Sequence, residues 1–508
     1  LCFEMEEGRK KIFQHCFEFE GHRLPYGGKM NISRVMIAAP KSGSGKTLVA
    51  CALLQALKNR GWQTAAYKCG PDYIDPMFHK QVIGVPSKNL DTFFTDEEQT
   101  KRLFLCDRME NDFAVLEGVM GIYDGLGGVR REGSSYHLAC VTKTPVVFVV
   151  DAKGMGRSII PLLTGFLQYD TEHLIRGVIL NRISKGYFET IKPLIEAELP
   201  VTVAGFLPEK EIYRIESRHL GLFMPDELGD IRERLQDVSE ELQKTVSVDT
   251  IVKIAESAQE LQTAEKTEAQ AKARRTATIC NKPVVIDSSH MSTPAGLVTI
   301  AVARDEAFCF YYEDNIALMK ENGANIRYFS PLRDEELPAG SHAVLLGGGY
   351  PELYAKKLSE NKKMREAVRK ASKIGMPIVA ECGGFLYLHR TMTDREGNRY
   401  PMAGVIHADC YNTGKSVRFG YIELHEKKNC FLPENISIRG HEFHYFDSTD
   451  NGADAIAQRP VTGKSYCCVI IDETHWMGFP HLYYPSNPVF AESFVEKARR
   501  YKERIIEK

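Results

Sequence analysis

The chain has 508 residues, which is enough for two or three domains, and its 43% hydrophobic and 26% charged content is ordinary for a globular protein. A formal net charge of −2 gives no reason to expect nucleic acid or an acidic membrane surface as a partner. The longest apolar runs, such as 145–150, fall far short of the roughly 20 residues that a membrane-spanning helix needs. Thirteen cysteines without zinc-type spacing favour a reducing compartment, so we expect a cytoplasmic protein.

The first part of the chain predicts an α/β domain. Residues 1–29 are charged and aromatic without an apolar signal-peptide core, and we expect them to be an extension of doubtful structure. From residue 35, short apolar runs alternate with segments of helical spacing such as Val49, Leu53 and Leu57. This alternation predicts a mostly parallel sheet, covered on both faces, in a domain over residues 30–260. We expect its strands at 35–39, 114–116, 146–150, 178–180 and 201–206.

A second strand–helix series begins after residue 296. The intervening segment is rich in Ala, Glu, Lys, Gln and Arg, which predicts a solvated linker at 261–296. Strands expected at 298–302, 343–346 and 377–380 indicate another open, mostly parallel α/β sheet in a domain over residues 297–495. Residues 496–508 are expected to be the end of a C-terminal helix.

A phosphate-binding loop is predicted between the first strand and the first helix. Residues 38–47 follow the Walker A pattern, except that Pro40 replaces the first glycine. Backbone N–H groups of such a loop cradle phosphate oxygens, its lysine supplies a cation, and its threonine can bind Mg²⁺. Lys41 stands where one branch of these proteins keeps a lysine that reaches across a dimer, so a homodimer is one expectation. The ATP-binding residues predicted here are Gly43, Ser44, Gly45, Lys46 and Thr47.

Acidic residues follow two later strands. Asp72 and Asp75 lie in a loop shaped by glycine and proline, and Glu117 and Asp124 bound a glycine-rich segment. Open α/β sheets bind ligands at the carboxyl ends of their strands, so Glu117 is expected to join the loop threonine at a Mg²⁺ site. Asn181 follows another strand and could contact the adenine of ATP or cap the next helix; the sequence leaves both open.

A thiol nucleophile is predicted at Cys382. The apolar strand at 377–380 runs into Glu-Cys-Gly-Gly, where a sharp turn would lift the thiol out of the sheet, as in a nucleophile elbow. Cysteine attack on an amide needs an oxyanion hole and a base. Flexible backbone near the thiol can aim N–H groups at an oxyanion, and the candidates are Gly348, Gly349 and Gly383. Three histidines are candidate bases, and spacing does not choose among His441, His444 and His481.

Seven motifs together resemble the cobyrinate a,c-diamide synthase family, over residues 32–490 and in the family's order. They lie at 42–47, 70–76, 117–125, 218–222, 347–352, 381–384 and 440–445. The resemblance implies a P-loop NTPase-like synthetase domain, similar to dethiobiotin synthetase, and a class I-like glutamine amidotransferase domain. It also implies Cys382 as nucleophile and His481 as its base. Leu482 and Tyr483 follow this histidine in place of the usual glutamate, so a Cys-His dyad is expected.

The implied reaction uses both domains. Cys382 releases ammonia from L-glutamine, while ATP and Mg²⁺, bound at Thr47 and Glu117, activate an acetate carboxylate of cobyrinate as an acyl phosphate. Asp72, Asp75 and Asp124 are expected to position the metal, the intermediate or ammonia. The sequence leaves four alternatives: the same reaction on another tetrapyrrole such as nickel-sirohydrochlorin, a cobyric acid synthase, a P-loop ATPase acting as a non-synthetic switch, or a binding module with an inert thiol.

Overall fold

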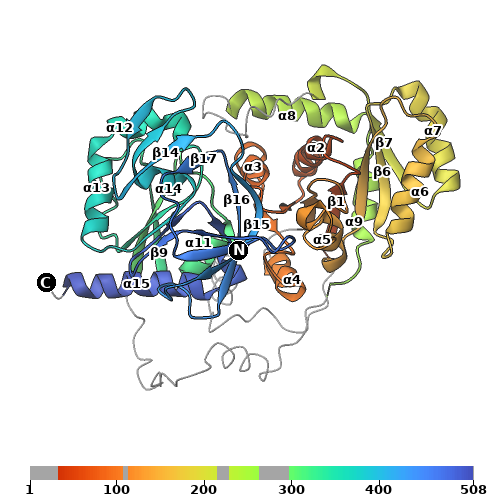
Figure 1. The fold of residues 1–508 in the computed structure, drawn as a ribbon. Helices are drawn as coiled ribbons and strands as arrows, with labels where there is room; N and C mark the ends of the chain where they lie inside the picture. The colour runs from red at the N-terminus through yellow and green to blue at the C-terminus, as the bar shows by residue number, and fades with distance from the viewer. Residues whose placement is uncertain (1–31, 107–111, 214–227, 262–296, 507–508) are drawn as a thin grey trace, which may run out of the picture.

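The computed structural model describes residues 32–106, 112–213, 228–261 and 297–506, which form two α/β halves lying side by side (Figure 1). The predicted extension at 1–29, the motif at 218–222 and the linker residues 262–296 lie outside the described residues. Among the described residues, no helix has both the length and the apolar character to cross a lipid bilayer.

The first half is built on a seven-stranded sheet in the order β3-β2-β4-β1-β5-β6-β7, and every strand pair is parallel. All five predicted strands are present within a residue or a few of their expected bounds. The strands β2 and β3 lie outside the predicted ranges. The strands are β1 (Ser33–Ala38), β2 (Thr64–Cys69), β3 (Ser87–Leu90), β4 (Phe113–Glu117), β5 (Val146–Asp151), β6 (Ile175–Asn181) and β7 (Thr202–Leu207).

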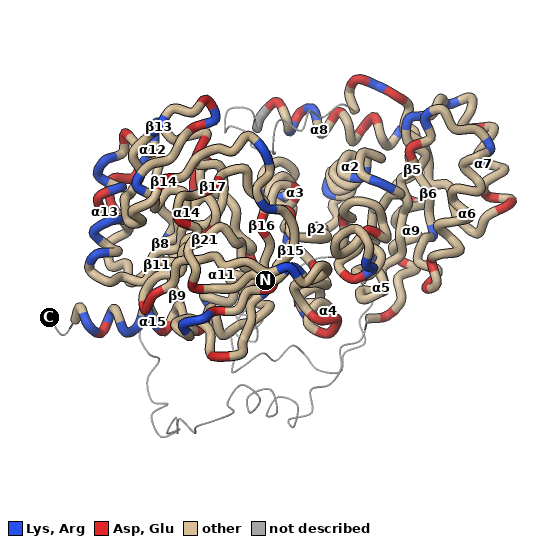
Figure 2. Tube along the Cα trace, in the orientation of Figure 1, with Lys and Arg blue, Asp and Glu red and all other residues tan. Residues whose placement is uncertain are grey.

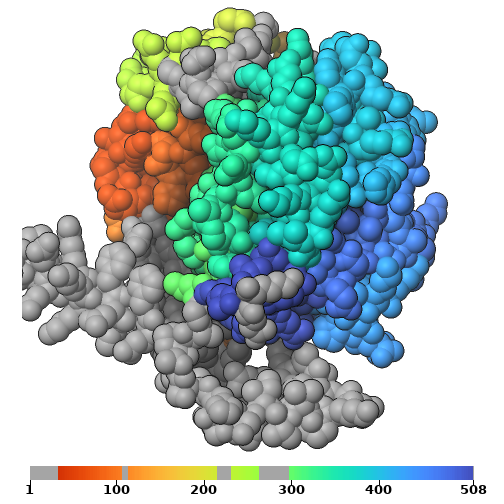
Figure 3. Space-filling model, turned by 90° about the vertical axis from the view of Figure 1, so that its left-hand side faces the viewer, coloured from red at the N-terminus to blue at the C-terminus, as the bar shows by residue number. Residues whose placement is uncertain are grey.

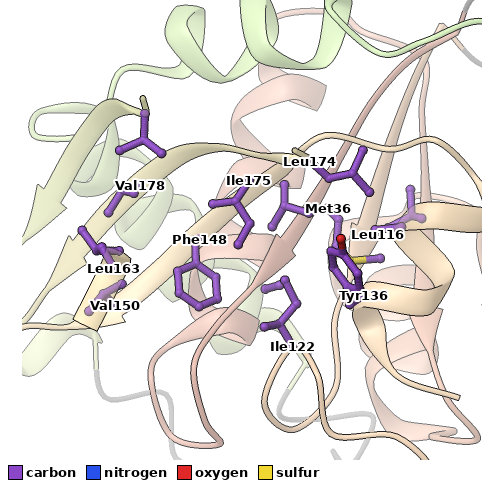
Figure 4. Packing of buried hydrophobic residues seen from close by; sticks show 14 of the residues in the cluster. Met36, Leu116, Ile122, Tyr136, Phe148, Val150, Leu163, Leu174, Ile175 and Val178 are labelled. Atoms are coloured by element: carbon purple, nitrogen blue, oxygen red, sulfur yellow. The ribbon is translucent and has the colours of Figure 1, made fainter. Parts of the chain in front are cut away.

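Helices cover both faces of this sheet because successive strand residues point to opposite sides. Met36 and Phe148 pack on one face against α5, α6 and α7, as Figure 4 shows for part of this core. Val35 and Val147 pack on the other face against α2, α8 and α9. The helices are α2 (Lys46–Asn59), α3 (Ile74–Phe78), α4 (Glu97–Cys106), α5 (Ser135–Val141), α6 (Ile159–Tyr169), α7 (Lys185–Glu198), α8 (Leu228–Gln243) and α9 (Val248–Glu256).

The second half is built on a six-stranded sheet in the order β20-β21-β11-β10-β8-β9, parallel except for its edge strand β20. Helices α12, α13 and α14 cover one face, and α11 and α15 lie on the other. These strands are β8 (Val298–Ala303), β9 (Ala324–Phe329), β10 (Ala343–Leu346), β11 (Ile378–Glu381), β20 (Ile470–Ile471) and β21 (His475–Gly478). The helices are α11 (Glu313–Glu321), α12 (Ala355–Glu360), α13 (Lys362–Lys373), α14 (Gly383–Leu388) and α15 (Val489–Ile506).

Two smaller sheets between β11 and α15 were not predicted. One has the order β13-β12-β14-β17 and the other, fully antiparallel, the order β19-β18-β15-β16-β22. The strands are β12 (His389–Thr393), β13 (Arg399–Pro401), β14 (Ile406–Asn412), β15 (Arg418–Glu426), β16 (Ser437–His444), β17 (Phe446–Ser448), β18 (Ala455–Gln458), β19 (Ser465–Cys468) and β22 (His481–Leu482). Figure 1 shows β15 and β16 where the two halves meet.

An aromatic seam joins the two halves, which Figure 3 shows packed against each other. We use "seam" for the buried cluster of Tyr73, Phe93, Phe94 and Leu126 from the first half with Tyr312 and Tyr483 from the second. The ring of Phe94 stacks on that of Tyr483 at 5.0 Å and 12°. Charges of both signs alternate along α8 and α15 (Figure 2). Apolar contact at the seam therefore holds the halves together.

Candidate active site

The phosphate loop connects β1 to α2 as predicted. Gly43 and Gly45 have φ of 76° and 100°, in the left-handed region that favours glycine. A Cβ at Gly45 would lie only 2.5 Å from Nδ2 of Asn181. That same Nδ2 donates to the carbonyl of Ser44 at 2.9 Å. Asn181 thus braces the loop, and the helix cap that the sequence left open for it is supplied by Ser184, which accepts from the N–H of Tyr187.

Lys46 lies at the start of α2 and is buried. Its Nζ donates to the carbonyl of Met120 at 2.6 Å and to that of Lys41 at 3.3 Å. Burial and the nearby Lys68 ammonium lower the pKa of Lys46. Both acceptors are backbone carbonyls, and a phosphate oxygen can take their place as the acceptor of the Lys46 ammonium. The ammonium is therefore available to an anion bound in the loop.

Glu117, at the end of β4, is the centre of a buried polar network. Its Oε1 accepts from Thr47 Oγ1 at 2.6 Å and from Lys68 Nζ at 2.9 Å. Its Oε2 lies 3.2 Å from Nε2 of His79. Burial alone would raise the pKa of Glu117, but Lys68 and its other partners hold it well below its usual range. Glu117 is therefore an ionised carboxylate beside the phosphate loop. Its hydrogen bond with Thr47 brings together the two residues that the sequence predicted to bind Mg²⁺.

Asp75 also contacts Lys68, through an ion pair with its ammonium. Burial and the Glu117 carboxylate raise the pKa of Asp75. Burial alone would lower the pKa of Lys68, but the two carboxylates raise it. The lysine therefore stays charged and links the loop of Asp75 to the end of β4.

The oxygen donors near this network fit Mg²⁺. Thr47 is exposed, and its hydroxyl and the carboxylates of Glu117 and Asp75 are the hard ligands that this ion prefers. Oε2 of Glu117 is buried, and the polar group beside it is Nε2 of His79, at 3.2 Å. Cys51 lies behind this carboxylate, but burial raises the pKa of its thiol, which disfavours the thiolate that a metal would need.

The other two predicted aspartates bond to their own loops. Oδ1 of Asp72 accepts from the N–H of Ile74 at 2.7 Å, at the start of α3. Oδ2 of Asp124 accepts from the N–H of Gly121 at 2.9 Å. Both loops follow neighbouring strands of the sheet, so Asp72 and Asp124 lie at the same sheet edge as the phosphate loop.

Cys382 forms the predicted elbow between β11 and α14. Its backbone has φ 44° and ψ −99°, a conformation that non-glycine residues rarely adopt. The elbow is held by a hydrogen bond from Cys382 N–H to the carbonyl of Gly478, at 2.8 Å. The residue is 7% exposed. Burial, together with the carboxylates of Glu352 and Glu442, raises the pKa of the Cys382 thiol, so the resting side chain is a neutral thiol.

Two of the predicted oxyanion-hole glycines lie close together beside this elbow. A Cβ at Gly383 would lie 3.0 Å from the nitrogen of Gly349, and a Cβ at Gly348 would clash with the ring of His481. The N–H of Gly349 makes no backbone hydrogen bond within the described chain, and the N–H of Gly383 faces the Cys382 sulfur, where it lowers the pKa of the thiol. Both nitrogens therefore lie where they can donate to an oxyanion formed on the thiol.

Strand register brings the candidate bases together. In the antiparallel pair of β16 with β22, His441 lies opposite His481, and their rings stack at 4.9 Å and 15°. His444 stacks on Phe479 at 3.9 Å, and its Nε2 lies 3.9 Å from the carboxylate of Glu442. Sequence spacing could not have shown that His441 and His481 meet, because their contact depends on the pairing of β16 with β22.

The ring of His481 lies beside Gly348, and this imidazole is neutral. Burial, with the neighbouring His441 and His444, lowers its pKa well below the usual value. Its Nδ1 is buried without a partner, and no hydrogen bond joins it to Cys382 or to a carboxylate among the described residues. Tyr483, which replaces the usual glutamate two residues on, instead donates to Asp314 at 2.8 Å.

A pocket of about 400 Å³ at the seam was missed by the sequence analysis. Both halves line it, and three arginines face it: Arg130, Arg439 and Arg459. Phe93 and Leu126 supply apolar wall, and Glu132 and Glu423 supply two carboxylates. The lining residues come from two segments, 92–132 and 423–463, that are far apart in the sequence, so no local sequence pattern predicts this pocket.

Comparisons with known proteins agree with this geometry. Residues 35–223 match the CobQ/CobB/MinD/ParA nucleotide binding domain, and residues 299–470 match the CobB/CobQ-like glutamine amidotransferase domain. Relatives named cobyrinate a,c-diamide synthase include those of Caldanaerobacter subterraneus (36% identity; 88% of this chain, 94% of the relative), Listeria innocua (37%; 84% and 90%) and Thermoplasma volcanium (35%; 94% and 99%). The chain belongs to the cobyrinate a,c-diamide synthase family, as its motifs predicted.

Proposed function

We propose that this protein amidates the a- and c-acetate carboxylates of cobyrinate, using ATP and ammonia drawn from L-glutamine. The observation that carries the proposal is the pairing of a cysteine elbow with a phosphate loop across one seam. Relatives that carry the name of this activity match most of the chain. The reaction is a carbon–nitrogen ligation, and we place it in the cytoplasm.

Glutamine hydrolysis takes place at the elbow. Cys382 attacks the side-chain amide carbon of glutamine, and His481 accepts the thiol proton and delivers it to the departing nitrogen. The N–H groups of Gly349 and Gly383 stabilise the oxyanion, each contributing on the order of 3 kcal/mol. Ammonia leaves, and water then cleaves the thioester to glutamate. The neutral thiol and neutral imidazole of the resting site fit a base that acts only as the substrate is attacked.

Carboxylate activation takes place at the phosphate loop. Lys46 and the loop N–H groups hold the phosphates of ATP, and Thr47, Glu117 and Asp75 hold Mg²⁺, which neutralises phosphate charge. A substrate carboxylate oxygen attacks the γ-phosphorus and ADP departs, leaving an acyl phosphate. Ammonia attacks the acyl carbon, phosphate leaves, and the amide remains. Asp72 and Asp124, at the same sheet edge, position the intermediate and the incoming ammonia.

The seam pocket suits a substrate with several carboxylates. Arg130 is exposed, and its side chain has no hydrogen-bond or ion-pair partner in the described chain. Arg439 donates to the carbonyl of Phe93 at 2.6 Å, and Arg459 to that of Phe419 at 2.7 Å. These guanidinium groups keep further donors for carboxylates. A homodimer, expected from Lys41, remains a prediction.

The test is conversion of cobyrinate with ATP and glutamine, followed by mass spectrometry of the corrinoid. We expect the mass change of two carboxyl-to-amide conversions. Cys382→Ala should lose this activity with glutamine and keep it with ammonia, because only the nitrogen donor is removed. Parallel assays with nickel-sirohydrochlorin identify the preferred tetrapyrrole. If the wild-type protein converts cobyrinate with neither nitrogen source, the proposal is wrong.

A further inference from the structure

Tyr73 lies between the two reaction sites. It belongs to the loop of Asp72 and Asp75 in the first half, yet its ring is buried in the seam and is 7% exposed. The ring stacks on Phe310 of the second half at 4.9 Å and 5°. It also lies 5.3 Å from the ring of His481. A residue of the synthetase half thus forms part of the wall against which the glutaminase base rests.

The same short loop reaches the phosphate site at its other end. Asp75, two residues after Tyr73, forms an ion pair with Lys68, and Lys68 bonds to Glu117. Glu117 in turn accepts from Thr47 of the phosphate loop. A nucleotide and its cation must disturb this network, because they compete for the same oxygens.

The loop backbone just before Tyr73 is braced from both halves. Asn89 Nδ2 donates to the carbonyls of Gly70 and Asp72, at 2.9 and 2.6 Å. The hydroxyl of Tyr312 donates to the carbonyl of Pro71 at 3.1 Å. Because the start of the loop is fixed, we expect a shift of Asp75 to move Tyr73 as well.

We propose that Tyr73 is a positioning residue that makes glutamine hydrolysis depend on the occupancy of the phosphate site. In the resting protein the ring packs His481 into an orientation that makes no hydrogen bond to Cys382. Binding of ATP and the metal ion draws Asp75 toward the phosphate site, Tyr73 moves with it, and His481 gains freedom to meet the thiol. This inference rests on the proposed function, and it adds a device that spares glutamine when no acyl acceptor is being made.

The first experiment measures glutamate released per amide formed, together with glutaminase turnover without ATP. The wild-type protein should release one glutamate per amide. Tyr73→Ala should raise glutaminase turnover without ATP by about tenfold, the size of a typical coupling free energy, and release excess glutamate. Tyr73→Phe keeps the stacking ring and should behave as wild type. Tyr445→Ala, which removes a half-exposed aromatic ring of the second half, is the matched control and should not uncouple the reaction.

A second measurement needs no amide product. A glutamine-mimicking electrophile should alkylate Cys382 faster when ATP and Mg²⁺ are present, in the wild type and in Tyr73→Phe. Tyr73→Leu should alkylate at one rate with or without ATP. If Tyr73→Ala and Tyr73→Leu keep both the strict stoichiometry and the response to ATP, the coupling role is wrong while the proposed function stands. A wild-type protein that forms no amide fails the proposed function, and its response to ATP still decides the role of Tyr73.

Discussion

Cys382 and its neighbour Glu381 are both buried, with 7% and 5% of their surface exposed. Glu381 is buried at the end of β11, where it accepts from the hydroxyl of Tyr484 at 3.2 Å and from the N–H of Leu482 at 3.4 Å. Burial raises the pKa of Glu381 to about 8 despite these bonds. The carboxyl group beside the nucleophile is therefore protonated at neutral pH, which keeps a negative charge away from the thiolate that forms during catalysis.

This shift predicts a pH-dependent stability. The folded-state pKa lies above the unfolded value of about 4.3, so the stabilisation is complete below that pH and is lost as the pH rises to about 8. Glu381→Gln cannot ionise and removes this loss. The free energy of unfolding of the variant relative to wild type should therefore increase from pH 5 to pH 8. The increase is about 1.4 kcal/mol for each pH unit in which Glu381 is ionised in the unfolded wild type and protonated in the folded one.

Denaturant unfolding at the two pH values measures this difference. Glu434→Gln, at an exposed position, is the control and should give the same free energy as wild type at both. A Glu381→Gln variant whose difference from wild type is equal at pH 5 and pH 8 would show that the buried carboxyl does not titrate in this range.

At the scale of elements, the phosphate loop illustrates how one glycine can matter more than another. Gly45→Ala must carry a side chain at φ 100° and also displace Asn181, which braces the loop. Gly43→Ala meets left-handed strain of about 1–2 kcal/mol, but no atom lies within 4 Å of its new Cβ. Titration with a fluorescent ATP analogue should show that Gly45→Ala weakens binding more than about tenfold relative to Gly43→Ala. Equal losses in the two variants would contradict the bracing role of Asn181.

The elements that the sequence predicted are those with a strong local signal. Continuous apolar strands such as β5 and β11 must be buried on both faces, and glycine-rich turns mark the loops that follow them. In β15, exposed and buried residues mix, so its pattern is far weaker. The resemblance favoured His481 among three histidines, but only the register of β16 with β22 shows how these rings meet. Asn181 lies at the end of a strand, as predicted, but neither adenine contact nor helix capping is established for it. Its bond to the carbonyl of Ser44 could not be predicted, because Ser44 is remote in sequence.

At the scale of the whole molecule, the site proposed for the acceptor needs both halves. The family assignment leaves the P-loop switch and the inert binding module without support, since relatives over most of the chain are synthases. Neither half alone encloses the seam pocket, because its arginines come from both. The proposed recognition of the substrate therefore requires the assembled chain.

Arg130→Gln tests this view of substrate recognition. A charge-assisted hydrogen bond is worth about 1.5–3 kcal/mol, so we expect KM for cobyrinate to rise about tenfold or more while KM for ATP and glutamine stays unchanged. Steady-state kinetics with each substrate varied in turn measures this split. Arg500→Gln, on the exposed face of α15, is the control. An unchanged KM for cobyrinate in Arg130→Gln would remove the pocket from the substrate site.

The stacked rings of the seam restrict how members of this family can be recombined. Phe94 packs on Tyr483, and Tyr73 packs on Phe310, so each half presents a shape that only the matching half fills. A chimaera that takes one half from a relative would leave voids or overlaps there unless the facing aromatics were transplanted with it. To exchange acceptor preference between paralogues, the seam residues of both halves must therefore be exchanged together.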